Sequence, residues 1–103
     1  MVPMLAITAV SDAGLSQLQG LTELKVLGLN QTRVTDAGLA SLKNLKNLND
    51  LTLGGSQITD QGLVQLRSLR NLRHLLLSGT GVTRAGAAEL KRALPEIQII
   101  SER

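Results

Sequence analysis

The chain has 103 residues, a formal net charge of +3, no cysteine and no aromatic side chain. This length suits one modest domain, whose core must be built from aliphatic side chains. Without cysteine the protein has no disulfide, thiolate nucleophile or cysteine-ligated zinc, and it fits a reducing compartment, which favours the cytoplasm. Without aromatic rings it lacks the side chains on which single-stranded nucleic acids usually stack.

The N-terminal segment "MVPMLAITAV" is apolar and begins without a basic residue. It is far shorter than the about 20 residues that cross a bilayer, so we expect neither a membrane span nor a signal peptide. Its apolar residues match a later stretch of the chain, with Leu5 against Leu29 and Val10 against Val34. Residues 1–9 are therefore predicted to be a partial repeat unit.

Three stretches of equal length follow one another without a gap, at residues 10–33, 34–57 and 58–81. The second begins "VTDAGLASL" and the third "ITDQGLVQL". Residues 82–103 continue the pattern if two residues are deleted before Leu94, and they carry Arg84 where the other units have Asp. This last unit is predicted to cap the C-terminal end, so that residues 1–103 form a single repeat domain.

The first half of each unit has the period of a helix. In the second unit Leu39, Leu42 and Leu45 lie three residues apart, which predicts one apolar helical face. Thr35 or Asp36 is expected to cap the N-terminus of this helix by accepting hydrogen bonds from backbone N–H groups.

The second half of each unit has the period of a strand. In "LNDLTLGGS", Leu51 and Leu53 alternate with Asp50 and Thr52, and two glycines then allow a tight turn. One unit cannot bury its leucines alone. Stacked units bury them between a parallel sheet and a layer of helices.

The strand segments "LKVLGLNQT", "LNDLTLGGS" and "LRHLLLSGT" resemble the L-x-x-L-x-L motif of leucine-rich repeats. "VTDAGL" and "ITDQGL" resemble the 24-residue variant of long bacterial arrays, and the cysteine-containing repeats of F-box-type adaptors. The resemblance implies a right-handed α/β solenoid with a parallel sheet on its concave face and α-helices on its convex face. It also implies a non-enzymatic module that binds a protein partner on the concave face.

Two features depart from that family pattern. The typical cysteine is absent, and the Asn that usually follows the strand is replaced by Thr32, Ser56 and Thr80. We expect the hydroxyl groups of these residues to supply an equivalent ladder of hydrogen bonds between units.

Residues that alternate with the core leucines are predicted to face outward on the sheet. The two expected columns across the strands are Val26, Asp50, His74, Glu96 and Gly28, Thr52, Leu76, Gln98. The residues predicted to contact a protein partner are Lys25, Asp50, Thr52, Arg73, His74, Leu76 and Glu96.

The expected neighbours Asp50, His74 and Glu96 have two interpretations. They could form a metal or proton-handling site, because His with carboxylates suits zinc. They could also form an exposed cross-strand charge ladder, which needs no metal and contributes little to stability. We favour the ladder, and we expect no cofactor. Ser78 lies about 13 Å along the strand from His74 by strand rise, so a Ser–His nucleophile is not expected.

Two further functions stay open. Basic residues recur at two repeat positions, which could attract a polyanion or simply solvate the convex face; they are Lys43, Arg67, Lys91 and Lys46, Arg70. The apolar N-terminal end has no polar capping helix, so the chain is either a segment of a longer array or pairs with another copy.

Overall fold

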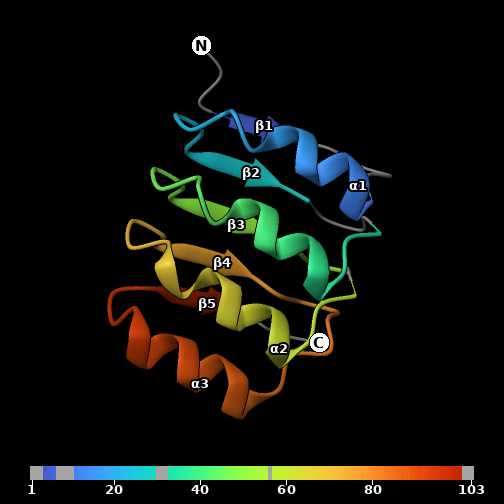
Figure 1. Ribbon diagram of the computed structural model, residues 1–103. Coiled ribbons are helices and arrows are strands. Elements are labelled where there is room, and N and C mark those ends of the chain that lie inside the picture. The colour runs from blue at the N-terminus through green and yellow to red at the C-terminus, as the bar shows by residue number, and fades with distance from the viewer. Residues whose placement is uncertain (1–3, 7–10, 30–32, 56, 101–103) are drawn as a thin grey trace.

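The protein is described here by a computed structural model that covers residues 4–6, 11–29, 33–55 and 57–100 (Figure 1). Within these residues five strands form one parallel sheet in chain order. They are β1 (Met4–Ala6), β2 (Val26–Gly28), β3 (Asp50–Thr52), β4 (His74–Leu76) and β5 (Gln98–Ile100). All helical segments lie on one face of this sheet (Figure 1). The architecture is the α/β solenoid that the sequence predicts.

The helical segments differ in type between units. Those of the first three units are α1 (Asp12–Leu15), η1 (Ser16–Leu18), η2 (Asp36–Leu42), α2 (Asp60–Leu63) and η3 (Val64–Ser68). They are short α-turns and 3₁₀-helices, whereas α3 (Arg84–Ala93) is a ten-residue α-helix. The leucine spacing explains the difference. A spacing of three matches the 3₁₀-helix, which has three residues per turn, whereas Leu90 and Leu94 in the last unit are four apart, as an α-helix requires.

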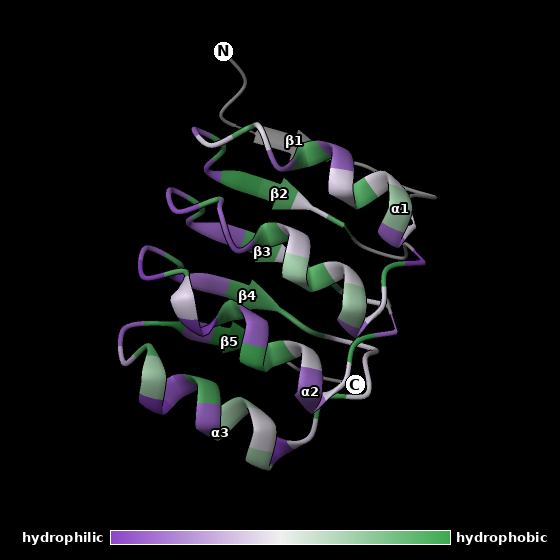
Figure 2. Cartoon of the chain, in the orientation of Figure 1, coloured by the Kyte–Doolittle hydropathy of each residue, from purple (hydrophilic) through white to green (hydrophobic). Residues whose placement is uncertain are grey.

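The core runs continuously through the stacked units. Hydrophobic residues recur in strands β2 to β5 and in the helical segments (Figure 2). The leucines that the repeat pattern predicts to be internal are fully buried, including Leu39, Leu42, Leu45, Leu51 and Leu53. Since each unit covers the leucines of its neighbours, the stack as a whole carries the stability.

The last unit keeps the regular register of the strands. Leu75 pairs with Ile99, as Leu51 pairs with Leu75, and the two steps along the sequence are equal. The two-residue deletion predicted before Leu94 is therefore wrong. Relative to the third unit, the last unit has one extra residue in α3 and one residue fewer just before β5. The second difference is seen in the spacing: Ile97 and Ile99 are two residues apart, whereas Leu72 and Leu75 are three apart. Ile97 is still buried, just ahead of the strand.

The chain between β1 and β2 is shorter than the repeat length predicts. Leu5 pairs with Leu27 and Leu27 pairs with Leu51, so the first step along the sequence is two positions shorter than the second. The predicted match of Leu5 to Leu29 is therefore wrong. The difference lies in the link between β1 and α1, because Ser11 and Thr35 start equivalent helical segments.

The Thr and Asp residues of the repeat motif form hydrogen bonds between neighbouring units. Thr35 makes no side-chain cap. Its backbone N–H and hydroxyl donate to the Asp12 carboxylate at 2.8 and 2.5 Å. Asp36 accepts from Thr59 in the same way, and Asp60 accepts from Thr83. We call these three pairs the Asp–Thr ladder. Among the described residues, the predicted local cap is found only at Thr83, whose hydroxyl accepts from the Gly86 N–H at 3.2 Å.

The glycine of the T-D-x-G motif makes room for this ladder. A Cβ atom on Gly38, Gly62 or Gly86 would lie closer than 3.0 Å to the carboxylate of Asp12, Asp36 or Asp60, respectively. Real Cβ atoms essentially never approach so closely. In this motif Thr is therefore the donor and Asp is the acceptor, and Gly leaves space for the Asp side chain of the preceding unit.

The predicted hydroxyl ladder after the strands is not formed by Thr80. Its hydroxyl donates to the Leu77 carbonyl at 2.7 Å, within its own loop. Thr32 and Ser56 lie outside the described residues. The predicted glycine turns are confirmed at Gly55 and Gly79, whose φ angles of 74° and 77° suit glycine best.

Candidate functional site

The strands present a second row of side chains opposite the core. In β2 and β3 the middle residue is buried and its two neighbours are half-buried, as alternation requires. We call this surface the concave sheet face. It comprises Val26, Gly28, Asp50, Thr52, His74, Leu76, Gln98 and Ile100. It is the face that does not carry the helices.

Asp50 and His74 meet at the centre of the concave sheet face. They are paired in register between β3 and β4, and His74 Nδ1 lies 2.7 Å from Asp50 Oδ1. Because a carboxylate only accepts, His74 Nδ1 carries the shared proton. The His74 side chain is 57% exposed and the Asp50 side chain is 40% exposed. A polar pair so open to solvent contributes little to folding, so it stays available for a partner.

The predicted place of Glu96 in this column is wrong. Gln98 pairs with His74, because the register keeps the same step as between β3 and β4. Glu96 instead lies in the turn before β5, where its Oε1 is 3.5 Å from Arg73 Nε. The expected cluster of one histidine and two carboxylates therefore does not form. Among the described residues no group of three or more His, Cys, Asp or Glu side chains could hold a metal ion.

The second column of the concave sheet face is more apolar than predicted. Ile100, not Gln98, pairs with Leu76. Leu76 is half-buried and Ile100 is 43% exposed. Thr52 lies beside Leu76, and its buried hydroxyl has no hydrogen-bond partner. A small apolar patch thus lies next to the Asp50–His74 pair.

The remaining predicted contact residues lie at the edge where the strands begin. Arg73 is held there, because its Nη1 donates to the Arg70 and Leu72 carbonyls at 2.9 and 3.3 Å. Together with Glu96 it borders a hollow of about 240 Å³. Lys25 is exposed, and its carbonyl accepts from the Asn49 and Asp50 N–H groups. The structure thus brings together Asp50, Thr52, His74 and Leu76 on the sheet, with Arg73, Glu96 and Lys25 at its margin.

Gln98 and Ile100 are the surface residues that the sequence analysis misplaced or missed. A signal for both exists in the sequence. Adding one full repeat length to His74 and Leu76 leads directly to them. The deletion before Leu94 obscured this signal, because Ile97 and Ile99 fit a buried strand position equally well.

One of the basic residues that recur through the repeats is held in a hydrogen bond within the chain. Lys43 and Arg67 are exposed. Lys91, at the same repeat position, donates its Nζ to the Ile97 carbonyl at 2.6 Å. It therefore supports the last unit, and one of its ammonium hydrogen-bond donors is already used within the chain.

Family assignment rests on the repeats themselves. Residues 22–82 match the family model for the leucine rich repeat. The chain belongs to the leucine-rich repeat family. No match to this leucine-rich repeat chain is found among curated proteins. Among the helices that the structure describes, none could serve as a membrane span.

Solved structures resemble this leucine-rich repeat chain over most of its length. An internalin (inlF) from Listeria monocytogenes is 23% identical over 95% of the chain, with a TM-score of 0.72. Internalin C2 from the same species is 29% identical over 91% of the chain, with a TM-score of 0.64. The chain covers only 26% and 38% of those two proteins. The Chaetomium Mex67:Mtr2 structure is 20% identical over 99% of the chain and 80% of its own, with a TM-score of 0.74.

Proposed function

We propose that this leucine-rich repeat domain is a non-enzymatic module that binds a protein partner on its concave sheet face. The observation that carries the proposal is the juxtaposition of the apolar pair Leu76 and Ile100 with the exposed pair Asp50 and His74. Stable interfaces commonly combine a small apolar centre with a polar rim.

The surface is also suited to binding because it is rigid. Its side chains stand on paired strands, and β2, β3 and β4 are anchored in the core by Leu27, Leu51 and Leu75. A preformed surface loses less conformational freedom on binding than a loop does. The expected partner places an apolar side chain on Leu76 and Ile100, and a polar or charged group beside Asp50 and His74.

Arg73 adds a further contact at the margin. Its guanidinium is already held by two backbone carbonyls and is 38% exposed. Arginine is enriched at interface hot spots, and here little extra ordering is needed when a partner binds. Arg73 therefore extends the proposed surface toward Glu96.

A capture experiment tests this proposal. The wild-type domain and an Arg73→Ala, His74→Ala, Leu76→Ala variant are used as bait in nuclease-treated lysate at moderate salt. A Lys43→Ala variant in the helical layer is the matched control. A protein retained by wild type and control but lost from the triple variant supports the proposal, once circular dichroism shows that all three fold. Equal capture by all three contradicts it.

Self-association is a second candidate, favoured by one exposed leucine. Leu21 is 41% exposed, whereas Leu45 and Leu69 at the same repeat position are fully buried. A second copy that covered Leu21 would remove this apolar surface from water. Sedimentation of the wild type and of Leu21→Glu over a range of concentrations tests this. Concentration-dependent mass in the wild type alone supports it, and monomers at all concentrations contradict it.

The finer family placement is also a proposal. We infer that the units are of the 24-residue T-D-x-G-L type found in bacterial arrays. Support comes from the Asp–Thr ladder, in which the Thr, Asp and Gly of that motif each have a structural role. The polyanion alternative is weaker, because Lys91 is committed to the Ile97 carbonyl.

A further inference from the structure

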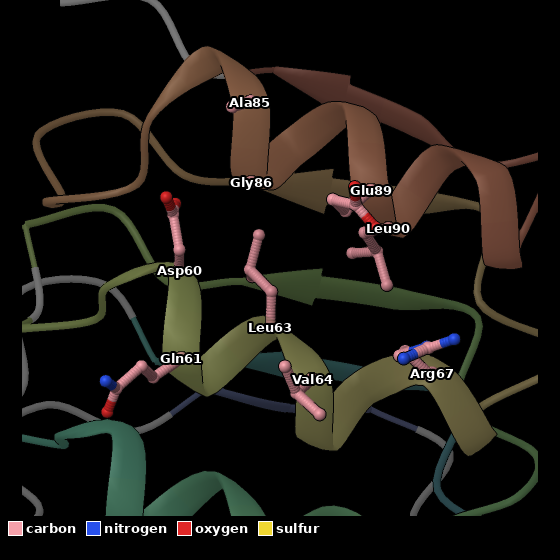
Figure 3. A pocket seen from close by; sticks show the side chains of 9 residues that line it. All are labelled: Asp60, Gln61, Leu63, Val64, Arg67, Ala85, Gly86, Glu89 and Leu90. Carbon is pink, nitrogen blue, oxygen red and sulfur yellow. The ribbon is translucent and has the colours of Figure 1, made fainter.

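A groove lies on the convex side, between the helical segments of the third and fourth units. It is bordered by α2 and η3 on one side and by α3 on the other (Figure 3). Its volume is about 340 Å³, at the lower end of the about 300–1,000 Å³ typical of ligand pockets. The buried leucines Leu63 and Leu90 form part of its apolar lining. None of the concave sheet face residues contributes to it.

Val64 makes this groove different from the rest of the convex surface. Its side chain projects beside the groove in Figure 3 and is 58% exposed, more than any other large hydrophobic residue that the structure describes. The same repeat position holds Ser16, Ala40 and Ala88 in the other units. Val64 is therefore not required by the repeat, and it adds apolar surface that contributes little to the core.

The charged side chains at the groove differ in whether their hydrogen-bonding atoms are already used within the chain. Both carboxylate oxygens of Asp60 accept hydrogen bonds from Thr83. Glu89 Oε2 accepts from Arg92 Nη1 at 2.8 Å. Arg67 is exposed, and no acceptor for its guanidinium is found among the residues that the structure describes. The groove thus offers an apolar lining next to an unpaired guanidinium.

We propose that this groove binds a short peptide segment of a protein partner that carries a large apolar side chain followed by an acidic residue. The apolar side chain covers Leu63, Val64 and Leu90, and the carboxylate pairs with Arg67. A guanidinium holds a carboxylate through two parallel hydrogen bonds, which gives direction as well as charge. An apolar anchor beside such a pair is the usual composition of a hot spot.

This inference adds a second binding surface to the proposed function. The groove and the concave sheet face lie on opposite sides of the solenoid, so the two sites can be occupied together. The domain would then bridge two protein segments. Each site has its own variants, so failure of one proposal leaves the other standing.

A tryptophan-containing probe tests the groove directly, because the chain itself has no aromatic residue to fluoresce. The probe is an acetylated, amidated tetrapeptide with the sequence serine, tryptophan, glutamate, serine. Its fluorescence anisotropy is followed while the domain is added. A second probe with glutamine in place of glutamate lacks the carboxylate. We expect wild type to bind the glutamate probe at least tenfold more tightly than the glutamine probe.

Matched variants locate the binding. Arg67→Glu is expected to weaken binding of the glutamate probe at least tenfold, and Val64→Ser at least threefold. Lys43→Glu changes the same charge at the same repeat position one unit earlier, and it should leave the affinity within twofold of wild type. The Arg73, His74, Leu76 triple variant should also bind normally. Urea unfolding of each variant shows that it is folded before binding is compared.

Three outcomes overturn the proposal. The first is no binding of the glutamate probe at millimolar concentration. The second is equal weakening by Arg67→Glu and Lys43→Glu, which indicates attraction to the overall charge. The third is dimeric wild type that becomes monomeric on Val64→Ser, because a second copy of the chain then occupies the groove.

Discussion

Asp36 accepts two hydrogen bonds from Thr59, one from the backbone N–H at 2.7 Å and one from the hydroxyl, across 23 residues of sequence. The same pairing joins Asp12 to Thr35 and Asp60 to Thr83. In the fourth unit the position of these aspartates holds Arg84, whose side chain cannot accept a hydrogen bond. The Asp–Thr ladder therefore joins the described units in series, and it ends at the fourth.

Removal of one acceptor should weaken the contact between two units. Asp36→Ala is expected to lower the free energy of unfolding by about 1–2 kcal/mol, because two hydrogen bonds to a charged group are lost. Arg84→Ala is the control at the same repeat position, and it should change stability by less than about 0.5 kcal/mol. Urea unfolding compares the two. Equal midpoints for both variants would show that the ladder carries no stability.

The glycine beside each aspartate should be sensitive to one added methyl group. Gly62→Ala places a Cβ against the Asp36 carboxylate and Leu39, and it should cost about 1–3 kcal/mol. Gly20→Ala should be neutral or slightly stabilising, because nothing lies within 4 Å of its Cβ position. In an Asp36→Ala background Gly62→Ala should cost at least about 0.5 kcal/mol less. Additive losses in this double-mutant cycle would contradict the steric explanation.

Neighbouring residues on one strand should differ sharply in their effect on stability. Leu51 is fully buried, whereas the Asp50 side chain is 40% exposed. Leu51→Ala is expected to cost about 2–5 kcal/mol, because it leaves a cavity in the core. Asp50→Ala should cost less than about 1 kcal/mol. Chemical unfolding measures both, and similar losses would invert our assignment of inner and outer faces.

Zinc should leave the protein unchanged. His74 has one carboxylate neighbour, Asp50, and the next residue in the column is the amide Gln98. A zinc site needs at least three protein ligands in most cases. We expect the same melting temperature with and without excess zinc, for wild type and His74→Ala alike. A rise seen in wild type and absent in His74→Ala would restore the metal interpretation.

The core was predictable because leucine spacing reports burial directly. The three-residue step from Leu39 to Leu45 and the alternation around Leu51 both identify buried positions, and these positions are confirmed. Helix type was less predictable. The same spacing of three that indicates a helical face also favours 3₁₀ geometry, which the period alone does not separate from an α-helix.

The errors arise where local rules compete with contacts between units. Thr35 and Asp36 have the chemistry of helix caps, so sequence reasoning placed their hydrogen bonds inside the unit. Stacking instead brings each aspartate to the next threonine. Glu96 was misplaced because Ile97 and Ile99 are both apolar, and only strand register decides between them.

The convex groove had no signal in the sequence. Its shape depends on how α3 rests against α2 and η3, and on Val64 standing where the other units have serine or alanine. A single valine in a repeat reads as ordinary variation. Only the structure shows that Val64 is exposed beside Arg67 and two buried leucines.

Binding to the concave sheet face is tested most directly by one affinity comparison. The captured partner is titrated by calorimetry into wild type, Leu76→Asp and the convex control Lys43→Asp. A charge at Leu76 should weaken binding at least tenfold, because the apolar centre of the interface is lost, while Lys43→Asp should bind within twofold of wild type. An unchanged affinity for folded Leu76→Asp would contradict the account and move the partner to another surface.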